Sequence, residues 1–164
     1  MFLCGVNYHK MTGFLGEYEI NMDVKGRFMM PAGFRKQLPK DYGSQFVINR
    51  GTAQCLNLYT IQEWEKLTTK LTELNDFLPK VQLFKRLMLS GASVLDLDSA
   101  GRLLLPKSLQ EYASLKKELV FSANINKVEI WDRANYYQHL QKHSHDLGQL
   151  SIDVFGDKFI DPFQ

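Results

Sequence analysis

The sequence contains Asp23-Val24-Lys25-Gly26-Arg27-Phe28-Met29-Met30-Pro31, and 75 residues later it contains Asp98-Ser99-Ala100-Gly101-Arg102-Leu103-Leu104-Leu105-Pro106. Four of the nine positions are identical, and the three residues before the proline are apolar in both copies. The apolar pattern continues downstream, where residues 46–48 match 119–121 and residues 55–59 match 127–131. General turn chemistry could explain a shared Asp, Gly and Pro, but not the shared downstream pattern. We therefore interpret the chain as two copies of one unit.

Each copy reads as a small β-rich unit. The aspartate can bond its own backbone and the glycine accepts positive φ, so residues 23–26 predict a turn between two strands. Pro31 suits the first turn of a short helix. Two further strands follow this helix, and after them a capping box at Thr60 and Glu63 opens an amphipathic helix. The expected strands are residues 17–22, 27–30, 45–49 and 55–59, and then 94–98, 102–105, 118–122 and 127–131. Short helices are expected at residues 32–38, after Pro106 and from Asp132 to about residue 142. The expected fold class is α+β, mostly β.

A linking helix is expected between the copies. Phe77, Val81 and Phe84 fall at helical spacing, and Pro79 is tolerated in a first turn. We expect this helix to pack onto both halves, although the same apolar stripe could also serve a subunit contact. The expected division is a first repeat at 14–72, a linking helix at 73–90, a second repeat at 91–142, and terminal extensions at 1–13 and 143–164.

Composition excludes several classes of protein. Of the 164 residues, 45% are hydrophobic, and no apolar run reaches the roughly 18–20 residues that a membrane span needs. We therefore expect a cytoplasmic protein with no membrane contact. Two cysteines are too few for a disulfide framework or a cysteine-built zinc site, and Cys55 is predicted to be a small core residue. A formal net charge of +2 does not by itself indicate nucleic acid, so a DNA binder would have to concentrate its charge locally.

The repeated Asp-x-x-Gly-Arg turn allows three interpretations. An enzyme site is disfavoured, because no nucleophile or general base accompanies the motif in both copies and no phosphate-binding loop is present. No cofactor or small-molecule ligand is evident either. A structural role is open, in which the aspartate caps the turn and pairs with the arginine. The third interpretation is DNA contact, since a guanidinium matches phosphates and guanine edges. The first copy concentrates basic residues within sixteen positions: Lys25, Arg27, Arg35, Lys36 and Lys40.

The second copy carries less charge. Arg102 and Lys107 remain, but Gln110 stands where the first copy has Arg35. If both turns contact DNA, we expect the first turn, with Lys25 and Arg35 beside Arg27, to contribute more of the binding.

Three histidines could be read as metal ligands: His139 near the end of the second repeat, and His143 and His145 in the C-terminal extension. No matching ligand set accompanies them, so a solvated tail is favoured and no metal site is predicted. The tail is also acidic, and we do not expect it to lie along DNA.

These motifs resemble those of the MraZ family, transcriptional regulators of the bacterial division and cell wall gene cluster. The resemblance covers about residues 14–141. It is carried by Phe14-Leu15-Gly16-Glu17-Tyr18, Asp23-x-x-Gly26-Arg27, Pro31-Ala32-x-Phe34-Arg35, Ser90-Gly91-Ala92 and Asp98-x-x-Gly101-Arg102.

The resemblance implies a fold and a function. The fold would be a duplicated swapped-hairpin (AbrB-like, SpoVT/AbrB) β-barrel, with short helices and both halves supplied by one chain. The function would be that of a sequence-specific DNA-binding regulator, generally a repressor. It would act at the nucleoid as a ring-shaped homo-oligomer on direct repeats upstream of its own operon. The alternative function is a protein-interaction scaffold that has no sequence-specific DNA binding.

The resemblance also implies roles for individual residues. Arg27 and Arg102 would contact DNA, and the charge cluster adds Lys25, Arg35 and Lys36 as expected contacts. Asp23 and Asp98 would orient the turn rather than touch DNA, because a carboxylate is repelled by phosphate. Gly26 and Gly101 are the other residues expected to shape the turns.

Overall fold

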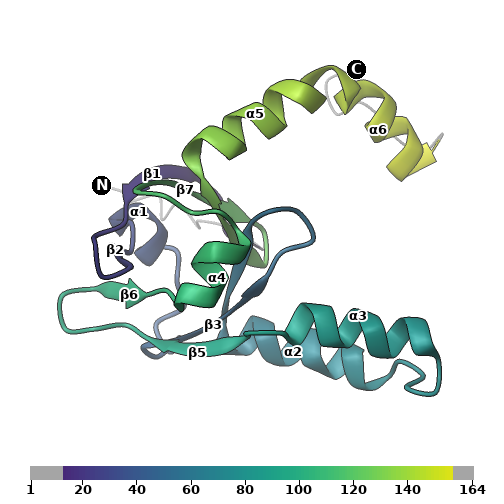
Figure 1. Cartoon of the computed structure of the whole chain (residues 1–164), viewed down its shortest axis with the longest axis horizontal. Coiled ribbons are helices and arrows are strands. Elements are labelled where there is room, and N and C mark those ends of the chain that lie inside the picture. Colours follow the sequence, from purple (N-terminus) through teal and green to yellow (C-terminus); the bar gives the residue numbers. More distant parts are fainter. Residues whose placement is uncertain (1–12, 157–164) are drawn as a thin grey trace, which may run out of the picture. The chain divides into compact units, whose positions relative to one another are not determined.

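The computed structural model of the chain describes residues 13–156 and divides into two compact units, Met1–Asp132 and Arg133–Gln164. Among residues 13–156, the first unit contains all the strands and four of the helices (Figure 1). The second unit contains α5 (Arg133–His143), the 3-10 helix η1 (Ser144–Asp146) and α6 (Leu147–Phe155). No helix between residues 13 and 156 is long and apolar enough to cross a membrane.

The strands of the first unit form one six-stranded sheet and one separate two-stranded ribbon. The sheet has the order β1-β7-β8-β4-β3-β5, the ribbon pairs β2 with β6, and all neighbours are antiparallel. The strands are β1 (Glu17–Asn21), β2 (Arg27–Met29), β3 (Gln45–Arg50), β4 (Leu56–Thr60), β5 (Ser93–Asp96), β6 (Arg102–Leu104), β7 (Glu118–Asn124) and β8 (Lys127–Asp132).

The two sequence copies exchange strands within this architecture. β1 of the first copy pairs with β7 of the second, β5 of the second pairs with β3 of the first, and β2 pairs with β6. In the sheet, β1, β3 and β4 of the first copy correspond to β5, β7 and β8 of the second. If each strand is replaced by its counterpart, the order of the sheet is simply reversed, so the sheet is symmetric between the copies. This arrangement confirms the α+β, swapped-hairpin class. The expectation of a closed barrel is wrong for the described residues: β1 and β5 remain as edges, because β2 and β6 pair with each other outside the sheet.

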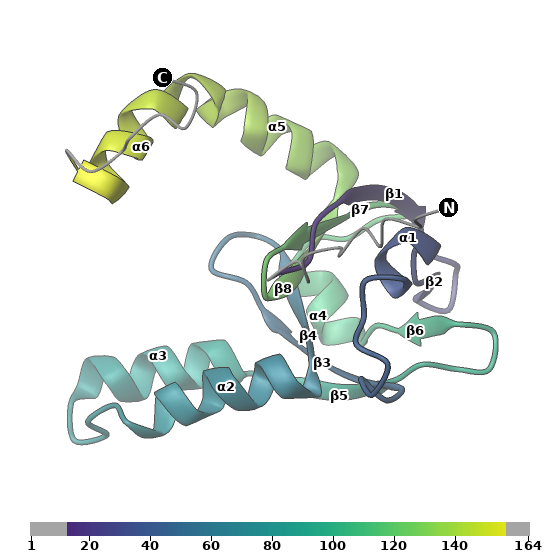
Figure 2. The ribbon, with the colours of Figure 1, turned by 180° about the vertical axis from the view of Figure 1, so that it is seen from behind.

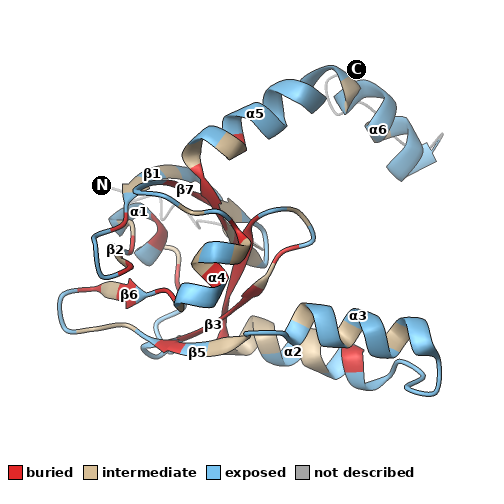
Figure 3. Cartoon of the chain, in the orientation of Figure 1, coloured by how far each residue is buried: buried red, intermediate tan, exposed pale blue. Residues whose placement is uncertain are grey.

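The core lies between the sheet, the ribbon and the short helices, and both copies contribute matching positions to it (Figure 3). Phe28 and Leu103 lie opposite each other in the ribbon and are 1% and 0% exposed. Phe34 and Leu109, on the two short helices, are likewise buried. Cys55 is buried as expected, and burial, with a smaller effect from the nearby Glu129 carboxylate, raises the pKa of its thiol to about 12.

The short helices begin where the prolines predict, but one of them ends early. α1 (Ala32–Arg35) follows Pro31, and α4 (Lys107–Tyr112) follows Pro106. α1 stops three residues before the expected Leu38. Leu38 precedes Pro39, and a residue before proline is disfavoured in helical conformation.

Two longer helices extend from the opposite side of the first unit from β2 and β6 (Figures 1 and 2). α2 (Ile61–Thr72) starts as its capping box predicts, with the Glu63 backbone N–H donating to Thr60 Oγ1 at 3.3 Å. α3 (Pro79–Leu89) lies within the range expected for the linking helix and begins at the proline. Its end reaches β3, where Asn49 Nδ2 donates to the Met88 carbonyl at 3.4 Å.

The ribbon provides a matched test of the core. Leu103→Ala removes a fully buried side chain and should lower the free energy of unfolding by about 2–5 kcal/mol. Leu104→Ala changes the next residue, which is 53% exposed, and should alter the free energy of unfolding by less than about 0.5 kcal/mol. Urea denaturation of both variants measures the difference. Equal losses would mean that the ribbon does not face the core in the way described.

Candidate nucleic-acid interface

The β2–β6 ribbon presents four side chains on one outer face. Arg27 lies opposite Leu104, and Met29 lies opposite Arg102. Side chains alternate between the two faces of a strand, and the central pair of the ribbon points into the core. The four flanking side chains therefore share the other face, where Met29 and Leu104 are 51% and 53% exposed. Two arginines and two apolar side chains thus form a small mixed surface.

The turn before Arg27 is held by its aspartate. Asp23 Oδ1 accepts hydrogen bonds from the backbone N–H groups of Lys25 and Arg27, both at 2.9 Å. The Gly26 N–H donates to the Asp23 carbonyl at 3.0 Å, and Gly26 adopts a φ of +84°, which a glycine accepts without strain. The side chain of Asp23 is therefore part of the turn itself.

The turn before Arg102 repeats this arrangement. Asp98 Oδ1 accepts from the N–H groups of Ala100 and Arg102 at 2.9 Å, and Gly101 has a φ of +80°. The two motifs identified in the sequence are therefore equivalent in three dimensions, although only the aspartate, glycine and arginine are common to both turns.

Each aspartate also sets the direction of its arginine. Asp23 Oδ2 accepts from Arg27 Nε at 2.8 Å, and Asp98 Oδ2 accepts from Arg102 Nε at 2.8 Å. The pKa of both carboxyls lies below the usual value, chiefly because the arginine backbone N–H donates to them; the guanidinium adds to this effect. Each Nε donates to its aspartate, and no hydrogen bond from the two Nη atoms of either arginine is found among the described residues. The Nη edge of each guanidinium can therefore make a bidentate contact.

The helix of each copy lies against the turn of the other copy. A Cβ atom placed on Gly101 would lie 2.8 Å from Arg35 Nη1, and one placed on Gly26 would touch Gln110 Nε2. Arg35 therefore accompanies Arg102 in the second turn. This corrects the expectation that Arg35 lies beside Arg27: the exchange of strands carries α1 across to the other copy's turn.

The same exchange brings Lys107 to the first turn. An open groove of about 630 Å³ is lined by Lys25 and Gly26 of that turn and by Lys107 and Gln110 of α4. Lys36 is exposed at the C-terminal end of α1. Both turns thus receive a cation from the other copy, which reduces the charge difference expected from the sequence.

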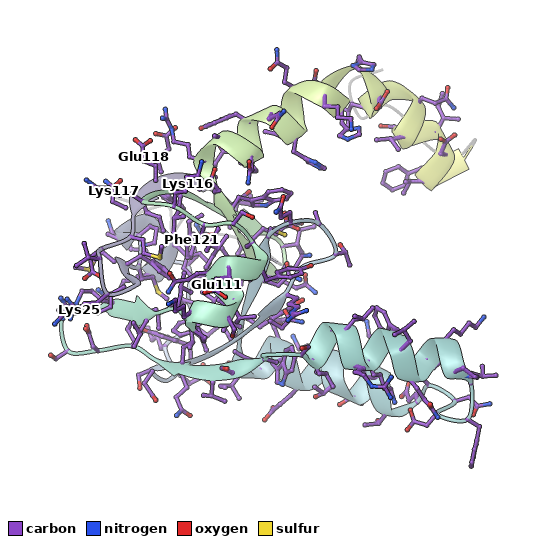
Figure 4. The ribbon with its side chains drawn as sticks, in the orientation of Figure 1. Lys25, Glu111, Lys116, Lys117, Glu118 and Phe121 are labelled. Carbon is purple, nitrogen blue, oxygen red and sulfur yellow. The ribbon has the colours of Figure 1, made fainter. Side chains whose placement is uncertain are left out.

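Two further lysines belong to this region and were not among the predicted contacts. Lys116 and Lys117 are exposed in the loop before β7 (Figure 4). The Met22 N–H donates to the Lys117 carbonyl at 2.8 Å, which places Lys117 next to the start of the first turn. Only the pairing of β1 with β7 reveals this proximity, because the two segments are far apart in the sequence.

The histidines of the second unit do not gather a ligand set in the described residues. The rings of His139 and His143 lie 4.9 Å apart, and His143 Nδ1 lies 3.2 Å from Asp146 Oδ2. Between residues 13 and 156, no group of three or more histidine, cysteine or acidic residues is placed to hold a metal ion.

The lowered pKa of Asp98 gives a pH-dependent prediction. Asp98→Asn keeps the shape of the side chain but removes its charge. A carboxyl whose pKa is lowered by folding contributes stability above its usual value of 3.8, and loses that contribution as the pH falls through the lowered pKa. We expect the variant to be less stable than wild type at pH 7, with the difference shrinking at about pH 3.

Urea denaturation at the two pH values measures this effect. Asp41→Asn is the control, because Asp41 is exposed and its carboxylate has no hydrogen-bond partner in the described part of the chain. If the difference in free energy of unfolding between wild type and D98N stayed constant with pH, the proposed role of the Asp98 charge would be contradicted.

Comparison with known proteins agrees with the repeated architecture. The family described as "MraZ protein, putative antitoxin-like" matches the chain twice, over residues 14–87 and 88–153. A protein named "Transcriptional regulator MraZ" from Christiangramia forsetii is 40% identical over 92% of this chain and 98% of its own length. A protein of the same name from Flavobacterium psychrophilum is 37% identical over 90% of this chain and 94% of its own length. Another from Halothermothrix orenii is 41% identical over 77% of this chain and 86% of its own length. The chain therefore belongs to the MraZ family of transcriptional regulators.

Proposed function

We propose that the outer face of the β2–β6 ribbon, together with its two turns, is the surface with which this regulator reads DNA. The observation that carries the proposal is the placement of Arg27 and Arg102 on one exposed face, each oriented by an aspartate at 2.8 Å. Such fixed orientation reduces the entropy lost when a long side chain binds.

The surface is a two-stranded β-ribbon, a shape that the major groove admits. The outer guanidinium edge matches guanine O6 and N7, while Met29 and Leu104 can contact thymine methyl groups. Cations beside the turns, such as Lys25 and Lys107, are suited to phosphate contacts, which position a protein without reading sequence. The aspartates bond the arginines and the backbone, so their role is to orient the turn.

We further propose that the chain acts as a homo-oligomeric ring on direct repeats upstream of its own operon, which it represses. A chain of net charge +2 has modest attraction for DNA, and several linked copies gain avidity on repeated sites. Exposed apolar side chains just before α3 are available for self-association: Phe77 and Leu78. In this proposal the protein is a nucleoid-associated cytoplasmic regulator of the division and cell wall genes, with no catalytic role.

The two ribbon arginines provide the direct test. Arg27→Ala and Arg102→Ala should each weaken binding to the duplex upstream of the protein's own gene by about tenfold to hundredfold at fixed salt. Arg86→Ala, at an exposed arginine on α3, is the matched control and should bind as wild type does. Fluorescence anisotropy against that duplex and a scrambled one measures both affinity and specificity. Wild-type affinity of R27A would exclude the proposed contact, and equal affinity for the two duplexes would favour the scaffold function.

The position of Arg35 gives a separate prediction. Because Arg35 lies at the second turn, its effect on binding should be coupled to that of Arg102 and independent of that of Arg27. The losses of DNA-binding free energy caused by R35A and R27A should therefore add in the R27A/R35A double variant. In the R35A/R102A double variant, the loss of binding free energy should differ from the sum of the two single losses by at least about 0.5 kcal/mol. Coupling to Arg27 instead would mean that each copy's helix serves its own turn when DNA is bound.

A further inference from the structure

A cavity of about 440 Å³ lies between the α2–α3 helix pair and the β3–β4 side of the sheet. It is distinct from the ribbon, because none of the residues that line it belongs to β2, β6 or their turns. One wall is apolar and comes from the helices, with Leu67 of α2 and Phe84 and Leu87 of α3. The size and mixed lining are those of small-molecule sites in proteins.

The opposite wall carries buried polar atoms that have no partner in the described part of the chain. Asn49 is 0% exposed; its Nδ2 donates to the Met88 carbonyl, whereas its Oδ1 accepts no hydrogen bond. Asn57 is 5% exposed, and its Oδ1 is also unpaired. The Nε of Arg50 is a third buried atom without a partner. Leaving such groups unsatisfied is costly, so their concentration around one cavity indicates a polar occupant.

The charges at the cavity favour an anion. The Arg50 guanidinium stacks 4.7 Å above the Tyr112 ring and, among the described residues, makes no ion pair with a carboxylate. Lys127, the other cation in the lining, is already paired with Glu129 at 3.1 Å. Arg50 is therefore a positive charge that its surroundings hold in place without neutralising.

We propose that this cavity binds a small amphipathic organic anion. Its aromatic or apolar body would pack against Phe84 and Leu87, its acidic group would pair with Arg50, and a hydrogen-bond donor would face the amide oxygens of Asn49 and Asn57. No sequence motif predicted this site. The proposal does not depend on the DNA-contact surface.

The probe for the test is 1-anilinonaphthalene-8-sulfonate, an aromatic anion whose fluorescence rises on binding, added to the full chain. We expect saturable binding of one molecule per chain. The uncharged analogue N-phenyl-1-naphthylamine should bind more weakly. Arg50→Gln should weaken sulfonate binding by about tenfold to hundredfold, and should abolish the preference for the charged probe.

Two further variants separate the cavity from general surface binding. Phe84→Ala removes part of the apolar wall at a residue that is 46% exposed, and should weaken both probes while leaving the fold intact. Leu83→Asn is the matched control: Leu83 is 52% exposed on the same helix but does not line the cavity, so neither probe should be affected. If L83N lost as much affinity for the probes as F84A does, the proposal would be overturned.

A structural readout completes the test. In ¹H–¹⁵N spectra, the side-chain amide signals of Asn49 and Asn57 should shift as the charged probe is added, with the same dissociation constant as the fluorescence titration. Unchanged amide signals would overturn the proposal. So would the absence of saturable binding, as expected if the cavity holds only water or a side chain of a neighbouring copy.

Discussion

The antiparallel pairing of β2 with β6 is the contact on which the rest of the first unit depends. It joins the two copies with their equivalent strands antiparallel, so that Phe28 and Leu103 lie opposite each other and both enter the core. It is extended at both ends by the turn glycines, whose carbonyls accept from the Leu105 and Met30 N–H groups at 2.9 and 3.0 Å. Within the first copy, β2 has only an isolated bridge between Met22 and Phe28, and its ladder partner comes from the second copy. A single copy would therefore leave both its ribbon edge and its half of the core exposed.

The same pairing assembles the proposed recognition surface from two copies of a structural motif. Within one copy, Asp23 stabilises a turn and bonds Arg27, which by itself is an ordinary arrangement for an aspartate. Once the ribbon forms, the equivalent Asp98–Arg102 pair appears on the same outer face. The carboxylates are engaged by backbone and guanidinium donors, so the surface presents the cationic edges of the arginines.

Strand exchange also redistributes charge. The net charge of +2 is spread over the chain, yet cations of the two copies meet at each turn: Lys107 with Lys25, and Arg35 with the turn of Arg102. The helices α2 and α3, which supply one wall of the cavity, extend from the side of the first unit opposite the ribbon (Figures 1 and 2). An occupant of the cavity would therefore leave the ribbon face uncovered.

The sequence by itself determined the duplication, the turns, the strands to within one or two residues, the Thr60 cap and the family. These features depend on local chemistry and periodicity, which can be read from neighbouring residues. Only the tertiary structure decided which helix meets which turn, that the sheet keeps β1 and β5 as open edges, and that Asn49, Asn57 and Arg50 surround one cavity. These features arise from contacts between distant segments, and a one-dimensional pattern carries no record of which segments come together.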